Sequence, residues 1–135
     1  MALITWTDSY SVKVKEFDQQ HQKLVSLIND LHEAMKAGKA KNIMEMMLDE
    51  LESYTAYHFK SEEDQMKKHT YPDMAKHIDE HIGFVKKVQD FKAQYSAGKA
   101  TLSLEISNFL RDWLLNHING TDKKYSDFFN QKGVK

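Results

Sequence analysis

The chain has 135 residues, and 19 Lys and Arg against 20 Asp and Glu give a formal net charge of -1. This length favours a single domain over residues 1–135, and the balanced charge lacks the basic excess that nucleic-acid binding requires. No apolar run reaches the roughly 20 residues that span a membrane, and the absence of cysteine excludes disulfides and thiolate metal sites.

The chain begins with a segment of about 17 residues that shows no helical periodicity, and we expect it to form an irregular N-terminal arm. It lacks the basic start and long apolar run of a signal peptide, so the expected compartment is the cytoplasm. A helix is then predicted from Asp18, as its N-cap, to Ala37, with Gly38 ending it. Its apolar residues recur at steps of three and four: Leu24, Ile28, Leu31 and Met35.

A second helix is predicted from Lys41 to Lys68. Its apolar stripe consists of Met44, Met47, Leu51, Tyr54 and Met66. A break follows at 70–73, where Pro72 suits the first turn of a third helix. The third helix is predicted to continue to Ala97, before Gly98. Its predicted inward residues are Met74, Ile78, Val85, Val88 and Tyr95.

A fourth helix is predicted from Thr101, followed by a short aromatic tail that packs back onto the other helices. The apolar residues of the helix are Ile106, Phe109, Leu110, Trp113 and Leu114, and those of the tail are Tyr125, Phe128 and Phe129. A single proline and five glycines suit long helices with few turns. We therefore predict an all-α fold, an up-down-up-down four-helix bundle with an irregular N-terminal arm.

Five histidines and one glutamate continue the apolar stripes of all four helices. They are His21 on the first helix, His58 and Glu62 on the second, His77 and His81 on the third, and His117 on the fourth. Residues four apart lie on one helix face, a spacing at which both side chains can bind one metal cluster. An unpartnered buried polar group costs about 1–3 kcal/mol, and a domain is stable by only about 5–15 kcal/mol. A lone inward histidine is usually an ordinary core residue, but this convergence predicts a metal site.

Three further polar residues do not follow the inward stripes as closely. His32 and His69 fit the pattern less well and are predicted to lie on the surface or in a second part of the core. Asp122 follows His117 by five residues, which in a regular α-helix turns it about 140° away. A π-type bulge near Gly120 would bring both residues onto one face. Alternatively, the helix ends at Gly120 and leaves Asp122 in solvent.

With Asp122 included, these residues resemble the ligand pattern of the hemerythrin family, namely H, HxxxE, HxxxH and HxxxxD in that order. Here the pattern is carried by His21, residues 58–62, residues 77–81 and residues 117–122. Trp6, the segment 18–21 and the pair at 71–72 look like the bacterial branch, the bacteriohemerythrins. The resemblance covers essentially the whole chain, and every ligand position of the family is present.

The resemblance implies a non-haem di-iron centre, two iron ions joined by a hydroxo or oxo bridge. One iron would be bound by His77, His81 and His117, the other by His21 and His58, with Glu62 and Asp122 bridging both. The second iron would have an open position, where dioxygen would bind end-on as hydroperoxide. Four residues match the apolar pocket of the family, namely Phe59, Trp113, Leu114 and Ile118. Of these, Leu114 is expected to control access to the pocket.

The resemblance thus implies a protein that binds oxygen reversibly for transport, storage or delivery and is not an enzyme. Its ligand would be dioxygen, which it could deliver to an oxygen-consuming enzyme. No nucleic acid or membrane is expected as a partner. A net charge near zero favours a monomer. Alternatives are a di-iron peroxide or nitric oxide reductase and an oxygen or redox sensor. Residues 77–81 also fit the H-x-x-E-H expression of zinc peptidases, with Glu80 as general base, but that leaves five aligned ligands unexplained.

Overall fold

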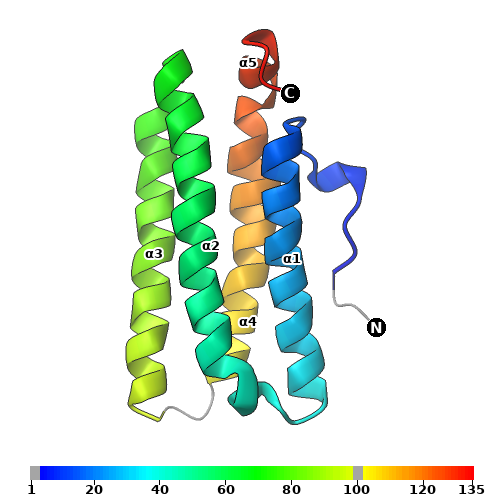
Figure 1. Cartoon of the computed structure of the whole chain (residues 1–135), viewed down its shortest axis with the longest axis vertical. Coiled ribbons are helices and arrows are strands. Elements are labelled where there is room, and N and C mark those ends of the chain that lie inside the picture. The colour runs from blue at the N-terminus through cyan, green and yellow to red at the C-terminus, as the bar shows by residue number, and fades with distance from the viewer. Residues whose placement is uncertain (1–3, 99–101) are drawn as a thin grey trace.

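The computed structural model describes residues 4–98 and 102–135, and within these ranges it contains helices but no strands. Four long helices run side by side and alternate in direction (Figure 1). They are α1 (Lys15–Lys36), α2 (Ala40–His69), α3 (Met74–Ser96) and α4 (Leu102–Trp113), and α4 continues as the π-helix η2 (Leu114–Thr121). This arrangement confirms the predicted up-down-up-down four-helix bundle. No helix in the described ranges is long and apolar enough to cross a membrane.

The helix ends agree only partly with the predicted ones. Gly38 and Gly98 follow α1 and α3 with φ of 71° and 80°, which agrees with their predicted role in ending helices. However, α1 begins at Lys15 rather than at Asp18, α2 is one residue longer at each end than predicted, and α3 begins at Met74 rather than at Pro72. The predicted start of α4, Thr101, lies outside the described residues.

Asp18 is not an N-cap, because it lies inside α1 and its carboxylate holds the N-terminal arm. This carboxylate accepts hydrogen bonds from the Ser11 hydroxyl at 2.6 Å and from the Val12 backbone N–H at 2.8 Å. Farther along the arm, the backbone of Ile4 exchanges two hydrogen bonds with the side chain of Asn29. The arm, which includes the short helix η1 (Asp8–Tyr10), is therefore fastened alongside α1 (Figure 1).

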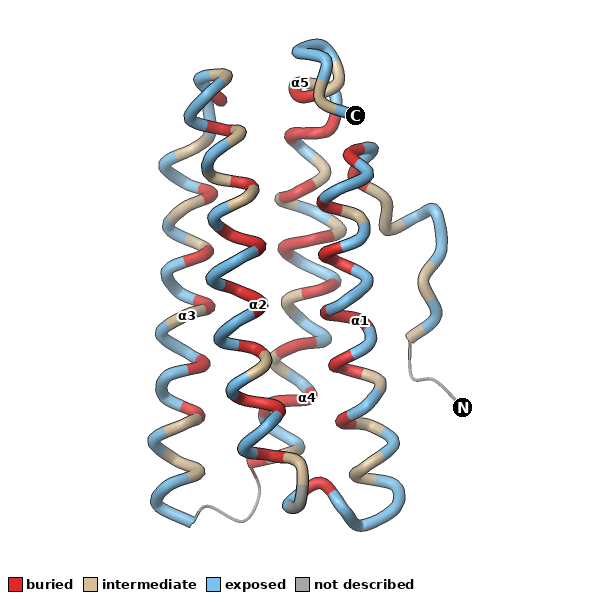
Figure 2. Tube along the Cα trace, viewed as in Figure 1, coloured by how far each residue is buried: buried red, intermediate tan, exposed pale blue. Residues whose placement is uncertain are grey.

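Buried residues line the inner faces of the four helices (Figure 2) and form two apolar clusters. The larger cluster includes Leu24, Leu51 and Phe84. The smaller cluster unites both ends of the chain with the turn between α2 and α3, and consists of Val12, Val14, Phe17, Met66, Tyr71, Tyr125 and Phe129. Tyr125 ends the short helix η3 (Asp122–Tyr125), and Phe129 lies in α5 (Ser126–Gln131), so the aromatic tail packs onto the bundle as predicted.

The predicted inward face of α3 is wrong in part. Its buried residues are His77, His81, Phe84, Val88 and Phe91, spaced by alternating steps of four and three. Of the apolar residues predicted to face inward, only Val88 is buried, and the others flank the buried row as half-buried residues: Met74, Ile78, Val85 and Tyr95. Met35, Phe109 and Trp113 on the other helices are likewise half-buried.

Candidate metal centre

A layer of polar side chains lies between the two apolar clusters, where all four helices contribute. On α1, for example, His21 lies between Phe17 of the smaller cluster and Leu24 of the larger one. Seven side chains make up the layer, and each is at most 2% exposed: His21, His58, Glu62, His77, His81, His117 and Asp122. The structure thus brings together all seven residues that the sequence pattern singled out.

The potential ligand atoms fall into two overlapping groups. Glu62, His77, His81, His117 and Asp122 each place one ligand atom within 4.8 Å of all the others. His21, His58, Glu62 and Asp122 meet the same criterion. Both carboxylates therefore belong to both groups, whereas three histidines belong only to the first group and two only to the second.

The two carboxylates lie between the imidazoles. Asp122 places Oδ1 at 2.8 Å from His77 Nε2 and 3.0 Å from His117 Nε2, while its Oδ2 lies 3.1 Å from His21 Nε2. Glu62 Oε1 lies 3.1 Å from His81 Nε2 and 3.4 Å from His58 Nε2. Each carboxylate therefore reaches histidines of both groups.

The π-helix η2 explains how Asp122 reaches this layer. The backbone N–H of Asp122 bonds the carbonyl of His117, five residues earlier, so the turn is one residue wider than in an α-helix. Gly120 lies within this wide segment. Asp122 is fully buried, which agrees with the bulge interpretation and rules out the alternative in which it faces solvent.

Charge compensation within the layer shifts several pKa values. Burial lowers the pKa of His21 and of His77, but the carboxylates of Asp122 and Glu62 raise these pKa values to about 9 and about 10. Burial disfavours the charged form of Glu62, yet the surrounding imidazoles hold its pKa well below the usual range. Burial lowers the pKa of His58 to about 3. Without a cation, the layer therefore stays neutralised in part by protons on His21 and His77.

The donor atoms of this layer fit metal ions. Six buried atoms directed at one another lack a partner with hydrogen-bond geometry among the described residues: Glu62 Oε1, both oxygens of Asp122, and Nε2 of His77, His81 and His117. Buried polar atoms without partners are rare in stable proteins, and bound cations are one way to satisfy them. Imidazole nitrogens with carboxylates suit iron and neighbouring transition metals. The layer therefore has the donor atoms and the burial of a site that could hold metal ions.

A second set of residues holds the outer nitrogens of the imidazoles. His58 Nδ1 lies 2.5 Å from Gln20 Oε1, His81 Nδ1 lies 2.7 Å from Glu63 Oε2, and His117 Nδ1 lies 2.9 Å from Glu80 Oε1. Glu80 also accepts a hydrogen bond from the Thr121 hydroxyl. Glu80 thus lies behind His117, and its Oε1 takes part in both bonds. Tyr125 donates its hydroxyl hydrogen bond to Glu62 Oε2.

Sequence reasoning missed these partners, although a signal for them exists. Gln20, Glu63 and Glu80 are each next in sequence to a residue of the polar layer. Neighbours on a helix point about 100° apart, so each of them reaches an imidazole on another helix instead. The clue was therefore a polar residue beside three of the inward ligands, His21, Glu62 and His81, on the flank that faces the adjoining helix.

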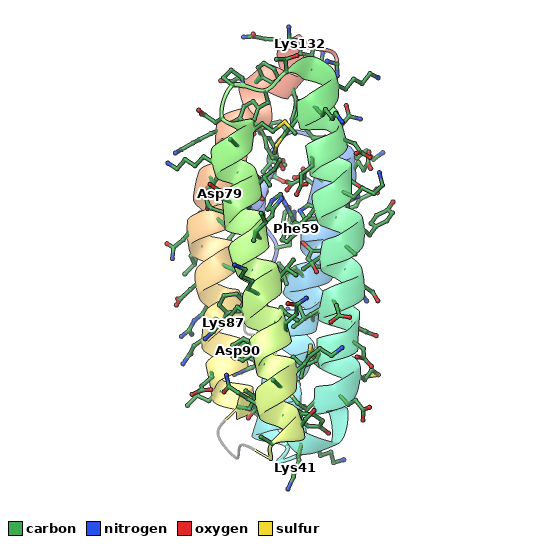
Figure 3. The ribbon with its side chains drawn as sticks, turned by 90° about the vertical axis from the view of Figure 1, so that its left-hand side faces the viewer. Lys41, Phe59, Asp79, Lys87, Asp90 and Lys132 are labelled. Carbon is green, nitrogen blue, oxygen red and sulfur yellow. The ribbon has the colours of Figure 1, made fainter. Side chains whose placement is uncertain are left out.

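Apolar side chains cover the layer on the side of the larger cluster. Phe59 stacks on His81 with ring centroids 3.8 Å apart, and Trp113 stacks on His117 at 3.9 Å. Figure 3 shows Phe59 midway along the bundle, between α2 and α3. Leu114 and Ile118 are fully buried in the same apolar cluster as Phe59. These four residues therefore form an apolar cover over this side of the layer.

The two remaining histidines lie apart from the polar layer. His32 and His69 are both half-buried, and neither belongs to the two groups of potential ligands. The ring of His69 lies 6.4 Å from that of Phe129, at the edge of the smaller apolar cluster. Both placements agree with the predicted surface or second-core positions.

Two bacterial proteins are similar to this chain over most of its length. The bacteriohemerythrin of Methylococcus capsulatus (strain ATCC 33009 / NCIMB 11132 / Bath) is 39% identical over 126 residues, which cover 93% of this chain and 95% of that protein. The bacteriohemerythrin of Stenotrophomonas maltophilia (strain R551-3) is 35% identical over 127 residues, covering 94% and 82%.

A crystal structure of wild-type hemerythrin superposes with a TM-score of 0.84 at 37% identity, covering 93% of this chain and 97% of the other. A family model described as the hemerythrin HHE cation binding domain matches residues 12–129. Since this model spans most of the chain and includes every residue of the polar layer, the chain belongs to the hemerythrin family.

Proposed function

We propose that the chain binds two iron ions and carries dioxygen reversibly. His77, His81 and His117 would hold one iron, His21 and His58 the other, and Glu62 and Asp122 would bridge them. The observation that carries this proposal is the overlap of the two ligand groups, which share the two carboxylates and nothing else. When bound, the iron pair supplies the redox chemistry that takes up and releases dioxygen.

The unequal ligand numbers favour a binding protein with one open position. The first group offers three nitrogens with the two shared carboxylates, and the second offers two nitrogens with the same carboxylates. An open coordination position is where an external ligand binds. We therefore place the dioxygen site on the side of His21 and His58.

The surrounding residues have two tasks in this proposal. Gln20, Glu63 and Glu80 fix the imidazoles so that Nε2 faces inward, and Tyr125 fixes the direction of Glu62. The apolar cover then excludes water, which would otherwise let reduced oxygen leave as peroxide and end reversibility.

Metal content and an optical cycle test the proposal. Elemental measurement should find two irons per chain in the wild type and in the control variant His32→Ala, but fewer in His81→Ala. The reduced protein under argon should gain a visible band when oxygen is admitted and lose it when oxygen is removed, over repeated cycles. Steady oxygen consumption would instead indicate an oxidase, and consumption of peroxide or nitric oxide a reductase.

A further inference from the structure

The hydrogen-bond partners of the outer imidazole nitrogens differ between the two ligand groups. In the group with three histidines, carboxylates accept from Nδ1 of His81 and of His117. In the group with two histidines, the neutral amide of Gln20 accepts from His58 Nδ1. Nδ1 of His21 is buried and has no hydrogen-bond partner in the described part of the chain.

This difference changes how strongly each imidazole donates to a cation. A carboxylate that accepts from Nδ1–H draws the proton outward and makes Nε2 more basic, whereas an amide does so more weakly. Imidazoles backed by Glu63 and Glu80 therefore stabilise a bound cation more than the imidazoles of His58 and His21 do.

Gln20 is held in the orientation that this role requires. Its Nε2 faces two acceptors, Glu16 Oε1 at 3.4 Å and Ser61 Oγ at 3.3 Å, so its Oε1 faces His58. The Ser61 hydroxyl donates its own hydrogen to the Tyr57 carbonyl at 3.0 Å, which leaves its oxygen free to accept. A glutamate has nearly the same shape as a glutamine and would also fit at position 20. The two residues therefore differ there in charge and not in size.

We propose that Gln20 is a positioning residue that keeps the two metal positions unequal. By backing His58 with a neutral amide, it leaves the metal position of His21 and His58 the weaker-binding and more Lewis-acidic one, which suits reversible capture of an external ligand. Glu63 and Glu80 make the other metal position the tighter-binding one. This inference rests on the proposed two-metal site.

The test is an anaerobic titration of the metal-free protein with Co²⁺, whose visible absorption reports each binding step. In the double variant Glu16→Gln with Gln20→Glu, a carboxylate backs His58, and the amide introduced at position 16 can donate to that carboxylate. We expect the affinity of the second Co²⁺ to rise by about tenfold or more. The matched control, Glu16→Gln with Gln19→Glu, has the same charge, but its new carboxylate is on the exposed neighbour Gln19. We expect no such rise there.

Two further measurements test the inequality of the two metal positions, one through Glu80 and one through the midpoint potential of the bound iron. Glu80→Gln should weaken the first Co²⁺ by about tenfold and leave the second less affected, so it tests the proposal even if the Gln20 variant fails to fold. After iron loading, the Gln20→Glu double variant should have a lower midpoint potential than its control.

Two negative results are distinguishable. If the wild type binds two Co²⁺ but the Gln20 variant equals its control and Glu80→Gln changes nothing, the inference is wrong and the proposed metal pair stands. If the wild type binds fewer than two Co²⁺, the proposed function is wrong, and the inference falls with it.

Discussion

The Tyr125 hydroxyl is a single group on which the direction of Glu62 depends. It is fully buried and donates to Glu62 Oε2, while Glu62 Oε1 faces the imidazoles. Burial, together with the charges of Glu62 and Asp122, raises the pKa of Tyr125 well above its ordinary value of 10.0. The hydroxyl therefore stays protonated, and so remains a donor, at neutral pH and well above it.

Removing this hydroxyl should destabilise the protein. Tyr125→Phe leaves a buried carboxylate oxygen without its donor, so we expect the free energy of unfolding of the metal-free protein to fall by about 1–3 kcal/mol. Tyr54→Phe is the matched control, because the Tyr54 hydroxyl is buried without a hydrogen-bond partner among the described residues. Denaturant titration should find Tyr54→Phe neutral or stabilising, and equal losses in both variants would contradict the role of Tyr125.

Leu114 allows a similar comparison at the apolar cover. It is fully buried, whereas its neighbour Leu115 is 49% exposed. Leu114→Ala should admit water and speed autoxidation, seen as faster decay of the oxygenated absorption band, while Leu115→Ala should leave the decay unchanged. An unchanged rate in Leu114→Ala would remove this residue from control of access.

Among the elements, α3 has one glycine inside the helix and another just after its end, and the backbone conformations of the two differ. Gly83 lies inside the helix, and an added Cβ there would meet nothing within 4 Å. Gly98 follows the helix with φ of 80°, a conformation that an L-residue adopts only with strain.

The same substitution should therefore have opposite effects at these two positions. Gly83→Ala should raise the free energy of unfolding by about 0.5–1 kcal/mol because alanine favours the helix. Gly98→Ala should lower it by about 1–2 kcal/mol. Thermal unfolding of both variants checks the two signs, and a loss of stability in Gly83→Ala would show that the site has hidden packing constraints.

The helices were predictable because burial of one face imposes steps of three and four along the chain. The correct face of α3 was not, since two neighbouring stripes satisfy that spacing, and the large rings of Phe84 and Phe91 decide between them. Asp18 looked like an N-cap because such residues often are, yet its carboxylate bonds the preceding arm. Helical phase predicted six of the seven residues of the polar layer. Asp122 is out of phase in a regular helix, so only the resemblance to the family pattern singled it out, and the π-helix brings it inward. Gln20, Glu63 and Glu80 could not be predicted in this way because their roles depend on contacts between helices.

Across the whole molecule, the polar layer joins the four helices through charges that must balance. In the metal-free protein, protons on His21 and His77 offset the two buried carboxylates, with pKa values of about 9 and about 10 against an ordinary 6.5. Because the folded state holds these protons more tightly than the unfolded state, their stabilising effect is complete below about pH 6.5 and is lost as pH rises through 9 to 10.

The metal-free protein should therefore lose stability between pH 6.5 and about 10, and the loaded protein should not. Bound cations would take over the balancing role, and ligands that bind only the folded state also stabilise it. Denaturant unfolding across this range, with and without a chelator, measures both effects. A flat profile for the metal-free protein would contradict the assignment of these protons.

The seven inward side chains come from positions 21 to 122, and the apolar cluster beside them is completed only by Tyr125 and Phe129. During synthesis the N-terminal part of a chain folds first, so Asp122, Tyr125 and Phe129 join the residues that precede them late. A truncation upstream of Asp122 would remove one of the two carboxylates that both ligand groups share, together with the aromatic rings of Tyr125 and Phe129.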